Sequence, residues 1–119
     1  MKLQHLLRGC GALALACSGA ITGGCVDTDN RPPTLEYITM TILKPSCSSA
    51  NCHSSLGKIE DLAFDTVEAA RESFNRRSPG GILRVMQRKG DEPMPPNDIV
   101  PDADLELIQA WIDAGSPGL

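Results

Sequence analysis

Near its middle the chain carries the stretch Cys47-Ser48-Ser49-Ala50-Asn51-Cys52-His53, two cysteines separated by four residues and followed directly by a histidine. A histidine placed directly after the second of two closely spaced cysteines is the attachment pattern of a c-type haem, usually written Cys-x-x-Cys-His. The two thiols must reach two vinyl groups on one porphyrin edge while the imidazole lies under the iron. Residues between the cysteines can loop outward without moving the sulfurs. The stretch therefore predicts covalent haem on Cys47 and Cys52, with His53 as an iron ligand.

Residues 1–24 resemble an export signal rather than part of a folded domain. A positively charged start is followed by an apolar stretch that runs to Ile21, and small residues then lead to Cys25. This order is similar to that of a bacterial lipoprotein signal, in which the cysteine is lipidated and begins the mature protein. Cys17 is a rival lipidation site, and an ordinary secretory signal is an alternative. An uncleaved anchor is disfavoured, because the run is shorter than the roughly 18 residues of a spanning helix.

The predicted mature chain is acidic. Removal of residues 1–24 takes away Lys2 and Arg8, which leaves nine basic and 15 acidic side chains and a net charge of −6. No run of basic residues is longer than two, so we do not expect binding to nucleic acid. An acidic electron carrier would favour a redox protein partner with a basic patch.

Residues 25–33 are polar and end in two prolines, so we interpret them as a tether between a lipid anchor at Cys25 and a domain over residues 34–119. Val26, rather than an aspartate, follows Cys25, which in Gram-negative lipoproteins favours the outer membrane. The predicted location is the periplasmic side of a bacterial membrane.

The predicted domain contains few aromatic residues, which are Tyr37, Phe64, Phe74 and Trp111. A chain of this length is marginal on side-chain burial alone and usually needs a disulfide, a metal or another internal link. A covalently held porphyrin would add a large apolar disc to such a core. The composition therefore fits a core built around a cofactor.

Two other uses of Cys47, Cys52 and His53 stay open. The thiols could form a structural disulfide beside a surface histidine, which an oxidising compartment permits. The three side chains could also bind zinc, although a structural zinc site takes four ligands and Cys25 is the one further candidate outside the leader. The export signal favours haem, because c-type haem is attached outside the cytoplasmic membrane.

The first half of the domain has one ambiguous segment and one predicted helix. Residues 35–44 have apolar side chains at helical spacing and also alternate as a strand would, and Pro45 is expected to end either element. Asp65 and Glu68 have the spacing of a capping box, which predicts that Asp65 caps a helix over residues 66–75.

The second half is predicted to contain two more helices. A short one is expected over residues 82–89, and the proline-rich residues 91–101 that follow must be irregular. The last helix is expected to begin with Asp102 as its N-cap, to bury Trp111 as a core residue and to end at Gly115.

The iron of an electron-transfer haem commonly takes a methionine opposite its histidine, because the thioether raises the reduction potential. His53 is the only histidine outside the leader, so a second histidine ligand from this chain is excluded. Met94 is the favoured ligand, since its loop Glu92-Pro93-Met94-Pro95-Pro96 is stiffened by proline. Met86 and Met40 are interpreted as core methionines.

From about residue 35 to residue 117 the chain resembles the small planctomycete-type cytochrome c domains of exported bacterial proteins. The resemblance rests on short motifs: Ile42-Leu43-Lys44-Pro45 before Cys47, an apolar stretch from Leu62 to Phe64, Met94-Pro95-Pro96, and Leu107-Ile108-Gln109-Ala110-Trp111-Ile112-Asp113-Ala114-Gly115. It implies one haem c on Cys47 and Cys52, axial His53 and Met94, and packing of the terminal helix against the helix before the haem motif.

These observations predict an all-α fold, a small cytochrome c-like bundle of three to four short helices around one covalent haem. The expected function is electron transfer on the outer side of the cytoplasmic membrane rather than enzymatic catalysis. No nucleophile and base pair stands out in the sequence, and an iron with both axial positions filled leaves none for a substrate. The alternative is a non-haem exported lipoprotein in which a Cys47–Cys52 disulfide stabilises a binding or scaffold domain.

Overall fold

A computed structural model describes residues 29–119, so the predicted export signal and the Cys25 anchor lie outside the described part. Within residues 29–119 the fold is helical and contains no β-strand, which confirms the all-α class. No helix in that range is long and apolar enough to cross a membrane. The elements are α1 (Leu35–Ile38), η1 (Thr39–Leu43), α2 (Lys44–Cys47), η2 (Ile59–Asp61), α3 (Val67–Arg76), α4 (Pro79–Met86) and α5 (Asp102–Asp113).

The ambiguous segment is a helix that runs without a break from α1 through the π-helical turn η1 into α2. The expectation that Pro45 would end it at residue 44 was wrong. In an α-helix the Pro45 ring would conflict with the carbonyl of Thr41, four residues back. The wider η1 turn precedes the proline, and Lys44 N–H bonds to the carbonyl of Thr39, five residues back. The helix therefore passes the proline and delivers Cys47 at its end.

The starts of α3 and α4 differ from their predicted positions because hydroxyl side chains cap them. Thr66, not Asp65, is the N-cap of α3, and its hydroxyl accepts a hydrogen bond from Ala69 N–H at 3.1 Å. α4 begins at Pro79 and ends at Met86, three residues earlier at each end than predicted. Ser78 is its N-cap, and Pro79 suits the first helical position because its φ is already helical.

α5 matches its predicted range, although Asp102 is its first helical residue and the N-cap is Pro101. The expectation of an Asp102 cap was therefore wrong by one residue. Gly115 follows the helix with a φ of +87°, and its N–H bonds to the carbonyl of Ile112. A residue with a side chain would be strained in that left-handed conformation, so glycine at this position ends the helix as expected.

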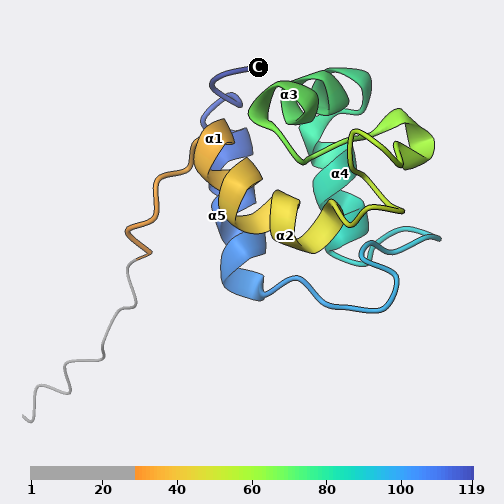
Figure 1. The fold of residues 1–119 in the computed structure, drawn as a ribbon. Coiled ribbons are helices and arrows are strands. Elements are labelled where there is room, and N and C mark those ends of the chain that lie inside the picture. Colours follow the sequence, from red (N-terminus) through yellow and green to blue (C-terminus); the bar gives the residue numbers. More distant parts are fainter. Residues whose placement is uncertain (1–28) are drawn as a thin grey trace, which may run out of the picture.

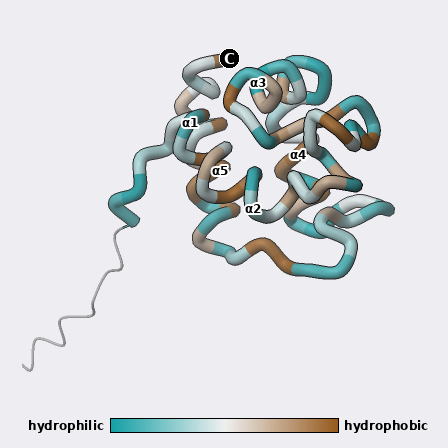
Figure 2. The backbone as a smooth tube through the Cα atoms, in the orientation of Figure 1, coloured by the Kyte–Doolittle hydropathy of each residue, from teal (hydrophilic) through white to brown (hydrophobic). Residues whose placement is uncertain are grey.

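α5 packs against both α1 and α4, and α3 packs against α1, η1 and α4. Figure 1 shows α1 and α5 together on one flank and α3 and α4 on the other. The packing of α5 against the helical segment before the cysteine motif agrees with the expectation above. Figure 2 shows that hydrophobic stretches also occur in the loop between α4 and α5, where Val100 is buried.

Trp111 lies at the centre of the core with no exposed surface, which confirms its core assignment. Its ring centroid lies 5.1 Å from that of Phe74, and Phe74 lies 5.9 Å from Phe64. The indole N–H donates to the carbonyl of Pro117 at 3.0 Å, so its polar atom is satisfied.

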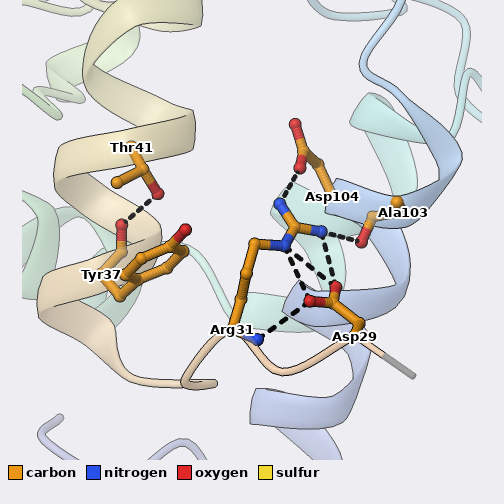
Figure 3. Close-up of polar contacts among 6 residues, drawn as sticks. All are labelled: Asp29, Arg31, Tyr37, Thr41, Ala103 and Asp104. Carbon is orange, nitrogen blue, oxygen red and sulfur yellow. Dashed lines mark hydrogen bonds and ion pairs between the residues drawn. The ribbon is translucent and has the colours of Figure 1, made fainter. Parts of the chain in front are cut away.

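Arg31 attaches residues 29–33, the end of the predicted tether, to the start of α5 (Figure 3). Its guanidinium pairs with Asp29 at 2.7 Å and with Asp104, and it donates to the carbonyl of Ala103 at 2.9 Å. Hydrogen bonds from Arg31 lower the pKa of Asp29, and the bonds to Asp29 and Asp104 raise the pKa of Arg31. Figure 3 also shows Thr41 donating to the carbonyl of Tyr37, at 2.6 Å.

Candidate functional site

A cavity of about 580 Å³ opens beside α4, between the end of α2 and the loop that follows α4. Three of the four side chains predicted to hold haem line it, namely Cys47, His53 and Met94. These residues come from three separate parts of the chain. The wall between them is mainly apolar and includes Leu43, Leu62, Phe64, Ile82, Val85 and Met86. The volume lies within the range of roughly 300–1,000 Å³ that cofactor and small-molecule sites occupy.

The cysteine motif folds as a loop whose two ends are joined. His53 N–H donates to the carbonyl of Cys47 at 3.1 Å, and Cys52 N–H donates to the carbonyl of Ser49 at 2.9 Å. Ala50 is exposed at the tip of the loop, whereas Cys47, Cys52 and His53 are half-buried. Ser49, Ala50 and Asn51 thus turn outward, as the four-residue spacing permits, whereas Ser48 is half-buried and its hydroxyl is buried. Cys52 is close enough for its charge to raise the pKa of Cys47, although it does not line the cavity.

His53 is held in one tautomer. Its Nδ1 lies 3.0 Å from the carbonyl oxygen of Ile59. A carbonyl can only accept a hydrogen bond, so Nδ1 carries the proton and the neutral ring has an unprotonated Nε2. Histidines that bind metals are oriented in this way, with the second ring nitrogen donating to a carbonyl or carboxylate. Phe64 adds an edge-to-face contact with a centroid distance of 5.8 Å.

Ser54 and Gly57 support this loop, and the sequence reasoning missed both. The Ser54 hydroxyl is buried, accepts from the N–H groups of Leu56 and Gly57, and donates to the carbonyl of Ala50 at 3.3 Å. A Cβ on Gly57 would lie 2.6 Å from the carbonyl oxygen of Cys52 and 2.9 Å from that of Ala50. Only glycine permits this approach, and no signal in the sequence distinguishes it from an ordinary loop glycine.

Asp65, which was expected to cap α3, instead fixes the far side of the same loop. Its carboxylate accepts from Ser55 N–H at 3.1 Å and from the Ser55 hydroxyl at 2.8 Å. The backbone hydrogen bond from Ser55 is the main cause that lowers the pKa of Asp65. Asp65 therefore links the loop after His53 to the start of α3.

The three methionines outside the leader have different surroundings. Met94 is half-buried in the cavity wall, and its N–H donates to the carbonyl of Val85 at 3.1 Å. Met86 also lines the cavity but belongs to the core, with 3% of its surface exposed, as predicted. Met40 is 44% exposed and lies outside the cavity wall, so its interpretation as a core residue was wrong. The structure therefore leaves Met94 and Met86 as the methionines at the site.

Both thiols of the motif are free in the structure rather than joined in a disulfide. Burial raises the pKa of the Cys47 thiol to about 11, with a smaller contribution from Cys52. Cys47 is thus a neutral thiol at physiological pH. Within residues 29–119 no group of three or more His, Cys, Asp or Glu side chains is arranged to hold a metal ion.

The charged side chains at the cavity are mostly acidic. Glu60, Asp91 and Glu92 line it together with the single basic residue Arg77. Arg77 pairs with Glu60 at 3.2 Å, and both side chains are more than half exposed. Two carboxylates therefore remain without an ion-pair partner among the described residues at the cavity rim.

Comparison of the chain with known protein families, with curated proteins and with solved structures returned no match.

Proposed function

We propose that this protein is a single-haem c-type cytochrome that carries electrons on the outer side of the cytoplasmic membrane. In this proposal Cys47 and Cys52 would hold the porphyrin through thioether bonds, and His53 and Met94 would bind its iron; Cys52 is the one of the four that does not line the cavity. The haem would supply reversible one-electron chemistry. The observation that carries the proposal is the convergence of Cys47, His53 and Met94 on one apolar cavity.

The residues present fit a haem in three respects. The cavity is large and mainly apolar, as a porphyrin requires. The bond from His53 Nδ1 to the Ile59 carbonyl leaves Nε2 available for a metal. Met94 belongs to a separate loop and lines the same cavity, so its thioether would be available as a second ligand of the iron.

The alternatives have weaker support. A Cys47–Cys52 disulfide would join the two thiols, which are free in the structure. A zinc site would need a fourth ligand, and the described residues contain no group of ligands arranged for a metal ion. Filled axial positions would also favour electron transfer over catalysis.

The proposed redox partner presents a basic patch. Asp91 and Glu92 at the cavity rim could contact such a patch close to the haem edge. The proposed location is the periplasmic side of a bacterial membrane, with the outer membrane favoured, through a lipid on Cys25. A Cys25→Ser variant should leave the membrane fraction while keeping its haem, whereas continued retention would move the anchor to Cys17.

Visible and near-infrared spectra of Met94→Ala and Met86→Ala test the core of the proposal in protein made by cells that attach haem. The wild type should show a Soret band and, when oxidised, the weak near-infrared band of a sulfur-to-iron bond. Met94→Ala should lose the near-infrared band, lower the reduction potential and bind carbon monoxide. Met86→Ala should keep the band and lose about 2–5 kcal/mol of stability, because Met86 is buried.

Three results would contradict the proposal. Purified protein without a Soret band would favour the disulfide alternative. Loss of the near-infrared band in Met86→Ala but not in Met94→Ala would assign the sixth ligand to Met86. A wild type that already binds carbon monoxide would have a five-coordinate iron and would favour ligand sensing.

A further inference from the structure

We infer that Arg88 is a positioning residue that holds the Met94 loop against α4 and so controls how readily the Met94 sulfur leaves the iron. This inference rests on the proposed function, because it requires Met94 to be an iron ligand. Arg88 does not line the cavity and is not one of the predicted haem ligands.

One carbonyl of α4 accepts hydrogen bonds both from the turn after the helix and from the Met94 loop. The carbonyl of Val85 accepts hydrogen bonds from Arg88 N–H and from Met94 N–H, each at 3.1 Å. Val85 also lines the cavity. The chain therefore leaves α4, turns at Arg88 and returns to the same helical turn at the proposed ligand.

The Arg88 guanidinium then fixes the part of the loop that follows Met94. Its Nη1 donates to the carbonyl of Pro95 at 3.3 Å and to that of Asp98 at 3.0 Å. Among the described residues no backbone N–H donates to a carbonyl of residues 95–99. Pro95 and Pro96 have no N–H of their own, so the loop cannot build a regular hydrogen-bonded turn there. Arg88 thus supplies a donor that the loop itself lacks.

The backbone of Arg88 is strained, which points to a role for its side chain. Its φ is +58°, in the left-handed region where residues other than glycine are disfavoured. A glycine would relieve this strain and keep the turn but would remove the guanidinium. Arg88→Gly therefore tests the contribution of the side chain to the loop while the conformation of the turn is kept.

The position also offers a conservative variant and a neighbouring control. Arg88→Lys keeps a positive charge and hydrogen-bond donors but loses the planar fork of the guanidinium, so it should restore part of the effect. Arg84, one helical turn earlier, donates through Nε to the carbonyl of Lys89 at 3.1 Å and makes no hydrogen bond to residues 91–99. Arg84→Gln is therefore the matched control.

Two measurements on the full haem-loaded chain test the inference. The first is the affinity of the reduced protein for carbon monoxide, which must displace the sixth ligand. The second is hydrogen exchange over residues 91–99, which follows loop opening without reference to redox activity. Arg88→Gly should raise both on the order of tenfold or more, the effect expected when hydrogen bonds from a charged donor are lost. Arg88→Lys should be intermediate, and Arg84→Gln should match the wild type.

The outcomes distinguish this inference from the proposed function. If Met94→Ala binds carbon monoxide strongly while Arg88→Gly behaves as the wild type, Met94 is the ligand and the inference about Arg88 is wrong. If Met94→Ala leaves carbon monoxide binding unchanged, the ligand assignment is wrong and the inference is overturned with it. Faster exchange in Arg88→Gly without tighter carbon monoxide binding would also overturn it, because the loop would open without releasing the ligand.

Discussion

Replacement of Gly57 by alanine should destabilise the domain and reduce haem attachment, although it adds only one methyl group. The added Cβ would lie 2.6 Å from the Cys52 carbonyl oxygen and 2.9 Å from the Ala50 carbonyl oxygen. Both atoms belong to the backbone of the cysteine motif, so neither can rotate away as a side chain would. The φ of Gly57 lies outside the left-handed region, so the cost is steric rather than conformational.

The expected loss is about 1–3 kcal/mol, the usual cost of an extra carbon forced into a packed site. In a domain of this size each kcal/mol corresponds to about 4–8 °C in the melting temperature. The loop must shift to relieve the contact, and Cys52 would shift with it. We therefore also expect a lower ratio of haem to protein in the purified variant.

Gly80→Ala is the matched control, because a Cβ there would meet nothing within 4 Å and the residue lies inside α4. Alanine at this position should stabilise the helix by about 0.5–1 kcal/mol. Thermal unfolding followed by circular dichroism at a helix wavelength gives both melting temperatures. Equal or increased stability of Gly57→Ala would refute the close approach of Gly57 to the motif backbone.

Three further predictions concern buried polar groups. Thr39→Val should raise the free energy of unfolding by about 1–3 kcal/mol in urea titrations, because the fully buried Thr39 hydroxyl has no hydrogen-bond partner among the described residues. A lower stability of the variant would show that the hydroxyl does have a hydrogen-bond partner. The buried Ser73 hydroxyl accepts from Ala63 N–H and donates to Ala63 C=O, each at 2.9 Å. Ser73→Ala should therefore lower the unfolding free energy in the same titrations by about 1–3 kcal/mol for each of these two backbone groups that is left unpaired. An unchanged urea midpoint would contradict those bonds. In haem-free protein that is shown to be folded, the rate of Cys47 alkylation should rise with pH until about pH 11. The stability that the neutral thiol contributes should be fully present below the unfolded-state pKa and be lost as pH rises through about 11. A plateau of the alkylation rate near pH 8.5 would show that Cys47 is not buried.

The sequence alone determined those helices for which the apolar spacing and the residues at the helix ends predict the same range. The apolar residues of α5 recur at helical spacing, and Gly115 suits the left-handed turn that ends the helix, so its range and the burial of Trp111 followed from the chain alone. Helix starts were less certain where two capping residues are adjacent. Asp65 and Thr66 can both cap α3, and the contact of Asp65 with Ser55, ten residues earlier, decides between them.

Residues 35–47 show the limit of periodicity more clearly. Their apolar side chains fit both a helix and a strand, and Pro45 marks an end by local rules. Contacts of α1 with α3 and α5 bury Leu35 and Ile38, and contacts of η1 with α3 accompany the burial of Ile42 and Leu43. A helical path gives these side chains one common face, so burial selects the helix and the π turn accommodates the proline.

The candidate site also has features that the sequence determines and features that only the tertiary structure determines. The types and spacing of Cys47, Cys52 and His53 determine which chemistry the chain can support, because they are adjacent in sequence. The cavity, the tautomer of His53 and the hold of Arg88 on the Met94 loop depend on residues that only folding brings together. Sequence patterns report local geometry over a few residues, whereas the position of a ligand relative to a cavity is set by the packing of helices that are distant along the chain.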